Sequence, residues 1–576
     1  MARERRQFSE AEILLAYADG RLLDLVVDEF RGAEPAIIAT NAAICAGLHN
    51  SGRIDILTLA QGSVFESLTQ FQFYATHHFF EPLIPQLKAP ALAMAAFVDR
   101  LVAKGGTDNA AGWPKSAFEI WCAEDPARIE AVLNAARTGD AVATSVMDAA
   151  LTADGRQVTA LAFLDDEPRA TWPMAIHALG RLKLSTEDKV SVLAALDREF
   201  PSPPGDLAQA QRIEVAIKLA KAIGEDAGVT LEAIMRRSLV GAEPLTLNAA
   251  ARALWLDRAA LPDPLVDLLL DALADLDPTY GVVVANLDQG LGTLLKGALA
   301  HKAVAFVERY VARHDIPLER FDRFLHELYS GPAERRDRVF VQWMIGSVQR
   351  LAQGCADALR GQEMAGEPKS LGLSNLDLTE RQAVRLCKRA VGYFFVQPVT
   401  AASILVAVLR EGPPAAAEAA GELLFDPLLI NYGGKTREYL LTIGADDPAH
   451  AAIQGALGRT DTYVEALRSV GDIKELHPPE LHLIIAQRLH QETMRKARKE
   501  ADEQSAFKGI FTNSLILHGP KVRSWQVGPD GKRKAFDMVL QTHGFSVELP
   551  RTEVADPIDL DYRLRRYCLE IEEDEA

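Results

Sequence analysis

The residues best suited to binding chemistry in this sequence are basic and lie near its C-terminal end. Between residues 488 and 534 there are eleven Lys or Arg and five Asp or Glu, a net charge of +6 in a chain whose formal net charge is −18. Such a cluster attracts an acidic partner, either a phosphate backbone or the acidic surface of another protein, and an indole within it can stack on a base. The segment is equally typical of a solvated helix end followed by an edge hairpin protected by lysines. The candidate residues for partner or nucleic-acid binding are Arg488, Arg495, Lys496, Arg498, Lys499, Lys521, Arg523, Trp525, Lys532, Arg533 and Lys534.

A second candidate is the core of a phosphate-binding loop at residues 433–436, Gly-Gly-Lys-Thr. A complete loop of this kind needs another glycine five positions before Gly434, where this sequence has Leu429, and a buried strand that leads into it. The flanking residues instead favour a helix that ends at a glycine and a second helix that begins there. We therefore predict a boundary between two helices and no cofactor-binding residue.

Two pairs of histidines raise the possibility of a metal site. His477 and His482 are five residues apart with two prolines between them, whereas ligands on one face of a helix stand four apart. His77 and His78 are adjacent in an aromatic run, so on a helix their side chains diverge by about 100°. The sequence thus predicts exposed or packed histidines and no metal ligand.

Acid–base chemistry has one further candidate, the pair His518 and His543. Each precedes a glycine at the end of an expected strand, and such a pair could exchange protons with a substrate. The sequence contains no serine in the GxSxG pattern and no GxGxxG after a strand. We predict no catalytic residue and an interaction protein more readily than an enzyme.

The composition favours a protein of the bacterial cytoplasm. The residues Glu10, Glu12 and Asp19 interrupt any apolar core of a signal peptide. The longest apolar stretch, residues 394–409, includes a glutamine and a proline and is shorter than the about 20 residues of a membrane span, so we expect a buried helix after a turn and no membrane partner. The cysteines are odd in number and none forms a CxxC pair, as is typical of a reducing compartment: Cys45, Cys122, Cys355, Cys387 and Cys568.

The elements that position these residues are helices over most of the chain. From about residue 8 to residue 507, apolar residues recur at three and four positions, and short Gly, Pro or Asp clusters separate the runs. Asp125, Ser185 and Thr379 stand where they can cap helices, the last with Gln382 at capping-box spacing. Residues 479–508 predict one long helix with charged last turns.

One stretch, Arg169 to Phe200, is a helix pair of about thirty residues that resembles a HEAT-type repeat of an α-solenoid. The resemblance is architectural and implies no particular activity. We therefore expect a mainly α protein, with an irregular HEAT-like solenoid as the leading fold and a multi-bundle helical array as the alternative. A small C-terminal antiparallel β-meander domain follows.

Composition also predicts where the chain divides. Residues 201–205, Pro-Ser-Pro-Pro-Gly, form a stiff connector, and residues 360–375 are polar enough to form an exposed loop. The expected domains are helical at 1–200, 206–360 and 376–508, the last ending in the long charged helix, and β-rich with an acidic tail at 509–576. The β-rich domain is predicted to contain strands at 514–517, 521–527, 535–542 and 545–549, with a hairpin turn at 528–532.

Three functions fit these features. The first is a non-catalytic helical scaffold in a multiprotein complex, with the C-terminal β domain as its docking or effector module. The second is a nucleic-acid-associated subunit that uses residues 488–534. The third is an enzyme whose site is assembled from distant residues. The scaffold explains the lack of catalytic motifs most simply, because an extended helical surface binds without reactive side chains.

Overall fold

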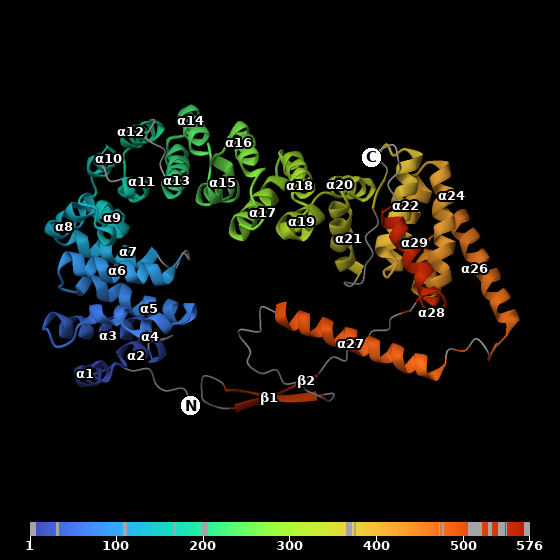
Figure 1. Ribbon diagram of the computed structural model, residues 1–576, viewed down its shortest axis with the longest axis horizontal. Coiled ribbons are helices and arrows are strands. Elements are labelled where there is room, and N and C mark those ends of the chain that lie inside the picture. The colour runs from blue at the N-terminus through green and yellow to red at the C-terminus, as the bar shows by residue number, and fades with distance from the viewer. Residues whose placement is uncertain are drawn as a thin grey trace. The chain divides into compact units, whose positions relative to one another are not determined.

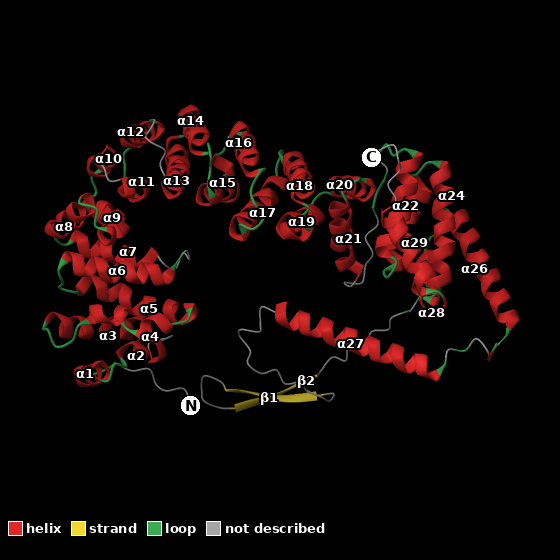
Figure 2. Cartoon of the chain, viewed as in Figure 1, coloured by secondary structure: helices red, strands yellow, loops and turns green. Residues whose placement is uncertain are grey.

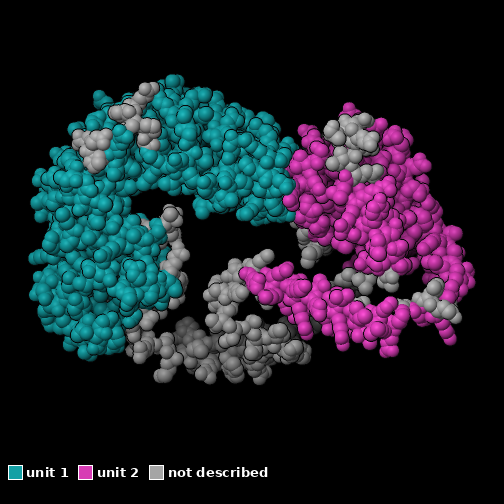
Figure 3. Space-filling model, in the orientation of Figure 1, with its two compact units in different colours: residues 1–336 teal, residues 337–576 magenta. Residues whose placement is uncertain are grey.

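The computed structural model describes residues 7–29, 34–106, 112–165, 169–198, 205–363, 371–373, 376–471, 473–474, 477, 479–504, 521–527, 533–539, 548 and 550–569. The described chain is mainly helical, which confirms the predicted class (Figure 2). It forms two compact units, residues 1–336 and 337–576 (Figure 3). The finer division into four domains stays a prediction.

The odd-numbered helices of unit 1 form a row, and each of them packs on the next odd-numbered helix. They appear as successive coils in Figure 1. Each helix buries an apolar stripe, as Ile213, Ala216 and Ile217 do in α13. We call this set the odd row. It comprises α3 (Pro35–Asn50), α5 (Gln70–Leu83), α7 (Gly112–Ala123), α9 (Ala141–Asp154), α11 (Trp172–Arg181), α13 (Asp206–Ile223), α15 (Pro244–Leu256), α17 (Gly281–Leu295) and α19 (Asp322–Ser330).

The even-numbered helices pack against the odd row as a second layer. Within this layer α6 contacts α8, and α10, α12, α14 and α16 contact one another in sequence. Two layers around one apolar core are what a stacked helical array requires. The second layer comprises α6 (Ala91–Gly105), α8 (Pro126–Arg137), α10 (Gln157–Asp165), α12 (Thr186–Asp197), α14 (Gly228–Ser238), α16 (Asp263–Leu273) and α18 (Ala300–His314), while α1 (Glu10–Ala18), α2 (Leu22–Glu29) and α4 (Ser63–Ser67) precede it.

Carboxylates of one helix bind the start of the next helix in the odd row. Asp206, the first residue of α13, accepts hydrogen bonds from the backbone N–H groups of Leu245 and Thr246 at 2.8 and 2.7 Å. Asp288 in α17 accepts two backbone N–H groups from the first turn of α19 at 2.8 Å each. The first N–H groups of a helix have no partner within it and attract negative charge. These carboxylates therefore hold together residues that lie 35 to 40 positions apart in the chain.

Two predicted helix starts in this unit are confirmed, and the two helices of the stretch from Arg169 to Phe200 pack mainly on other helices. Asp125 and Ser185 cap α8 and α12, as expected. However, α12 packs mainly on α13 and α14, and α11 packs on α10, α9 and α13. Val190 of α12 is half exposed and Val192 is buried, because α12 packs mainly on α13 and α14, which follow it in the chain.

Unit 2 begins within α20 (Ala333–Ile345), which crosses the boundary between the units. The longest apolar stretch of the sequence forms α23, which begins at Pro398 and is buried along most of its length, as predicted. Leu371 and Leu373, in a segment expected to be an exposed loop, are buried instead, because the N–H of Leu373 bonds to Glu411 and fixes the segment against α23. The helices are α21 (Gln349–Glu363), α22 (Glu380–Phe394), α23 (Pro398–Glu411), α24 (Pro414–Leu423), the π-helical turn η8 (Leu424–Leu429), α25 (Lys435–Leu441), α26 (His450–Val470), α27 (Glu480–Gln504), α28 (Arg551–Ala555) and α29 (Pro557–Leu569).

Arg389 on α22 is a buried arginine whose side chain binds carbonyl groups at the C-terminal end of α20. Its Nη1 donates hydrogen bonds to the backbone oxygens of Met344 at 2.8 Å and Gly346 at 2.6 Å. The last carbonyl groups of a helix lack partners within the helix, and a cation there also matches the helix dipole. The guanidinium thus joins α20 to α22 within unit 2.

Replacement of Arg389 by methionine is expected to lower the free energy of unfolding of unit 2 by about 2–3 kcal/mol, because two buried carbonyl groups lose a charged donor. Urea denaturation compared with wild type measures the loss. The control is Arg565→Met, whose side chain is mostly exposed and pairs with Asp561 on the surface, where a change below about 1 kcal/mol is expected. Equal losses in both variants would contradict this role of Arg389.

The C-terminal helix α29 packs on α22, so this part of the segment predicted to be β-rich is helical. The contact requires a glycine, because a Cβ atom at Gly392 would lie 2.7 Å from Cys568 Sγ and 3.1 Å from the backbone oxygen of Leu564. Arg563 of α29 also lies 3.3 Å from Asp426. Residues more than 130 positions apart therefore form one core.

Strands are described only for the backbone of residues 521–527 (β1) and 533–539 (β2). They pair antiparallel, with Lys521 opposite Val539 and Val527 opposite Arg533. The other expected strands, at 514–517 and 545–549, lie outside the described residues apart from position 548. A β-meander domain is thus not shown. The described strand β2 begins at Arg533, two residues before the predicted strand 535–542, and positions 540–542 lie outside the described residues.

Candidate interaction surface

A long segment of unit 2 leaves the helical core of that unit midway along α26. The first half of this helix buries Ile453, Leu457 and Thr460. Where it leaves the core, Asp461 forms a bidentate pair with Arg437 at 2.8 and 3.0 Å. From residue 461 to residue 470 nearly every side chain is exposed. We call residues 462–547 the arm.

The arm returns to the place it left. Glu548 accepts a hydrogen bond from the N–H of Gly434 at 2.9 Å, and the N–H of Thr552 donates to Asn431 Oδ1 at 2.7 Å. Gly434 and Asn431 lie a few residues before Arg437, which binds the departing end. Both ends of the arm are therefore fixed to one short segment of unit 2, and the basic residues predicted to bind a partner lie between these fixed ends.

The helix α27 forms the centre of the arm and buries none of its described side chains. Leu481, Leu483, Ile484, Ile485 and Leu489 are each between 42 and 64% exposed. Four of these apolar residues recur at spacings of three and four, which places them on one side of the helix. The same side continues into basic residues. We call this side the stripe, and it consists of Leu481, Ile484, Ile485, Arg488, Leu489, Glu492, Arg495, Lys496 and Lys499.

Of the residues predicted to bind a partner, five lie on α27 and are exposed: Arg488, Arg495, Lys496, Arg498 and Lys499. All except Arg498 belong to the stripe. Over the whole helix, five Lys or Arg face five Asp or Glu, so its net charge is zero. Most of the net charge of +6 predicted for residues 488–534 therefore comes from residues 505–534, with six basic residues and one acidic residue.

The remaining predicted residues belong to the hairpin. Lys521, Arg523 and Trp525 lie in β1, and Arg533 and Lys534 lie in β2. The register places Arg523 opposite Asp537 and Trp525 opposite Ala535. Lys532 lies outside the described residues. The structure thus brings these five positions together along one two-stranded ribbon, separate in sequence from the stripe.

The glycine-rich motif at 433–436 is a helix boundary, as predicted. The helix α25 begins at Lys435, directly after Gly434. The carboxylate of Glu548 binds the N–H of Gly434, so an acidic side chain of the chain itself occupies the position that a phosphate oxygen takes in nucleotide-binding loops.

The histidine candidates pack against an aromatic ring, are exposed, as His477 and His482 are, or lie outside the described residues. The imidazole of His77 stacks on Trp113 at 5.3 Å between ring centroids, and its Nε2 lies 2.8 Å from Glu81. His482 is exposed on α27, and His518 and His543 lie outside the described residues. Within the part of the chain that the structure describes, no group of three His, Cys, Asp or Glu side chains could hold a metal ion.

Four of the cysteines, Cys45, Cys122, Cys355 and Cys387, are buried, and Cys568 is partly exposed. Burial raises the pKa of Cys45, Cys122 and Cys387 to about 12 and that of Cys568 to about 11, and it also raises the pKa of Cys355. At neutral pH these groups stay protonated, and a protonated thiol is a poor nucleophile.

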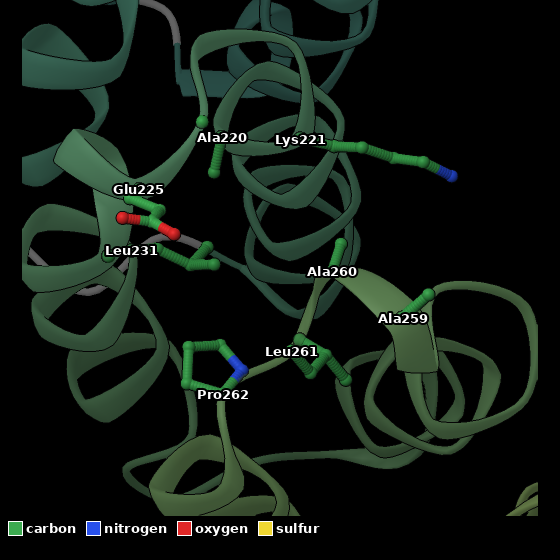
Figure 4. A pocket seen from close by; sticks show the side chains of 10 residues that line it. Ala220, Lys221, Glu225, Leu231, Ala259, Ala260, Leu261 and Pro262 are labelled. Carbon is green, nitrogen blue, oxygen red and sulfur yellow. The ribbon is translucent and has the colours of Figure 1, made fainter.

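A pocket of about 450 Å³ lies in unit 1 between the ends of α13, α14 and α15 (Figure 4). Leu231, Leu261 and Pro262 give it an apolar wall, while the side chain of Lys221 extends away from it. Glu225 and Lys221 are the charged residues among those that line it. Such a wall suits an apolar group and offers little for catalysis.

The strongest cluster of titratable groups in unit 1 is one that the sequence did not reveal. Asp148 on α9 is completely buried, and its carboxylate lies 3.0 Å from Lys115 Nζ on α7 and 2.8 Å from His177 Nδ1 on α11. Burial alone would raise the pKa of Asp148, but the hydrogen bonds and charges of His177 and Lys115 outweigh it and hold this pKa below its ordinary value. The cluster therefore joins three successive helices of the odd row.

No known protein family matches this chain by sequence, and no curated protein does so either. In the described residues no helix is long and apolar enough to cross a membrane. Fold and surface together define a mainly α-helical protein with a two-layered helical unit, a second compact unit and an arm whose central helix exposes an apolar and basic stripe. Reasoning from the sequence found the basic part of the stripe and missed its apolar part, although the spacing of residues 481–489 carries it.

Proposed function

We propose that this chain is a non-catalytic helical scaffold of a bacterial, cytoplasmic multiprotein complex. In this proposal the helix pairs of unit 1 are HEAT-like repeats, and the C-terminal part of the chain supplies the docking module. The observation that supports it most is α27, a helix of 25 residues with every described side chain exposed. Burying one exposed leucine or isoleucine stabilises a complex by about 1.5–3 kcal/mol. A partner that covers the leucines and isoleucines of α27 therefore gains this free energy several times.

Deletion of the arm tests the proposal. Residues 471–547, the part of the arm that follows α26, are replaced by a flexible Gly-Ser linker, and tagged wild-type and arm-deleted chains are isolated from the native host. We expect the wild-type chain in a stoichiometric complex, and the arm-deleted chain alone with an unchanged melting temperature of the two units. A wild-type chain that is free in the host extract, or a complex that survives the deletion, would contradict the proposal.

A second candidate function is nucleic-acid binding through residues 488–534, supported by their net charge of +6. If it is right, retardation of a DNA duplex in a gel falls steeply as salt rises, and the variant with Arg495, Lys496, Arg498 and Lys499 reversed to glutamate no longer binds. Unchanged binding in this variant would contradict nucleic-acid binding through residues 488–534.

A further inference from the structure

We propose that the stripe of α27 docks lengthwise on an acidic protein partner, with Leu481, Ile484, Ile485 and Leu489 in an apolar groove and Arg495, Lys496 and Lys499 against carboxylates at one end of that groove. This inference rests on the proposed function and names the chemistry of its partner. The helix-in-groove mode uses residues at spacings of three, four and seven, which the stripe provides.

The distribution of charge along α27 gives the partner its chemistry. Within residues 481–499 the stripe carries four basic residues and one acidic residue, and the other sides of the helix carry only Arg498. Among these stripe residues, Leu481, Ile484 and Ile485 precede the first basic one, and Arg495, Lys496 and Lys499 follow the last apolar one. A matching surface is therefore apolar at one end and acidic at the other.

A second copy of this chain fits the stripe poorly. Parallel pairing of two α27 helices would place Arg488 and Arg495 opposite their own copies, and like charges that face one another destabilise a helix pair. Antiparallel pairing over the full stripe, residues 481–499, would place Ile484 opposite Lys496 and Ile485 opposite Arg495, so that apolar side chains would cover charged groups without a counter-ion. The symmetry of an antiparallel homodimer makes each of these contacts twice.

A nucleic acid fits it poorly as well. The net charge of α27 is zero, and Glu500 and Glu503 follow Lys499 directly along the helix, where they would repel phosphates. Leu481, Ile484 and Ile485 have no counterpart on a phosphate backbone. The protein partner is thus the occupant that both halves of the stripe favour.

Photo-cross-linking in the native host tests the inference. The photoreactive residue p-benzoylphenylalanine replaces Ile485 in one full-length chain and Lys496 in another, with Leu483, which is exposed outside the stripe, as the control position. We expect positions 485 and 496 to cross-link to the same protein, at an apolar segment and at an Asp- or Glu-rich segment respectively, and position 483 to cross-link to neither segment. Cross-links to nucleic acid, to a second copy of the chain, or to no protein would overturn the inference.

Affinity measurements with the cross-linked protein, purified, complete the test. Ile484→Glu/Ile485→Glu is expected to weaken binding by about 30-fold or more, the scale of a central contact, while the matched control Leu483→Glu/Met494→Glu on other sides of α27 stays within about twofold of wild type. Lys496→Glu/Lys499→Glu should weaken binding and reverse its salt dependence, and Asp→Lys changes in the partner should restore it. An equal loss of affinity in the Ile484→Glu/Ile485→Glu variant and in its control would show that the stripe is not the side of α27 that binds. If a stable complex persists through all of these variants, the inference fails while the proposed scaffold function stands.

Discussion

Replacement of Asp148 by asparagine is expected to lower the free energy of unfolding of unit 1 by about 3 kcal/mol. The carboxylate is completely buried and binds Lys115 at 3.0 Å and His177 at 2.8 Å. Asparagine has almost the same shape but no charge, so the largely buried ammonium of Lys115 loses its counter-ion, and breaking a buried pair on one side costs about 3–5 kcal/mol. Urea denaturation followed by the fluorescence of Trp121, which is buried on the adjoining α7, measures the loss.

The matched control is Asp267→Asn. Asp267 also pairs with a lysine, Lys302 at 2.6 Å, but its side chain is half exposed, so the change should cost less than about 1 kcal/mol. If both variants lose the same stability, the Asp148 cluster does not hold the odd row together in the way described.

The contribution of Asp148 should depend on pH in a defined direction. Its pKa in the folded chain is lowered, so the ionised carboxylate stabilises the fold above the pKa of the unfolded chain, and this stabilisation is lost as the pH falls through the folded pKa. The difference in stability between wild type and Asp148→Asn should thus shrink as the pH falls below about pH 4. A difference that grows below about pH 4 would contradict the lowered pKa.

Replacement of Gly392 by alanine is expected to destabilise unit 2 by about 1–3 kcal/mol, although alanine is the better helix former. The added methyl group would lie 2.7 Å from Cys568 Sγ and 3.1 Å from the backbone oxygen of Leu564. Because a backbone oxygen cannot move alone, α29 must shift away from α22. Urea denaturation measures the loss, and the rate at which Cys568 reacts with a disulfide reagent, slow while burial holds its pKa near 11, should rise.

Gly421→Ala on α24 is the control, because a Cβ atom there meets nothing within 4 Å. This change should leave the reactivity of Cys568 unchanged and stabilise by about 0.5–1 kcal/mol through helix propensity alone. An equal gain in stability in the two variants would show that α29 does not pack on Gly392.

The local structure of this protein could be predicted from the sequence because its causes are local. Thr379 and Gln382 form the expected capping box at the start of α22, and Pro398 begins the apolar helix α23. Packing partners could not be predicted, since they depend on contacts across tens of residues. The pairing of α12 with α13, the burial of Leu373 and the return of α29 onto α22 all depend on such contacts.

The candidate site likewise has a feature that the sequence predicts and features that it does not predict. The cluster of charge around Lys496 and Lys499 is evident from composition, but its position between two ends fixed at Gly434 and Arg437 is not. Nothing in the local sequence singles out Asp148, because its partners Lys115 and His177 are 33 and 29 positions away. Neither separation follows from the repeat of a helix or a strand, so these contacts cannot be recognised in a single sequence.

Hydrogen–deuterium exchange over residues 480–504 tests the central claim, that the arm is a docking element, most directly. The purified chain is compared with the complex that it forms in the native host. We predict that the backbone amides of α27 exchange rapidly in the isolated chain, because α27 buries none of its described side chains, and that those of residues 481–499 become protected by at least about tenfold in the complex. Protection that is already complete in the isolated chain, or exchange that is unchanged in the complex, would contradict it.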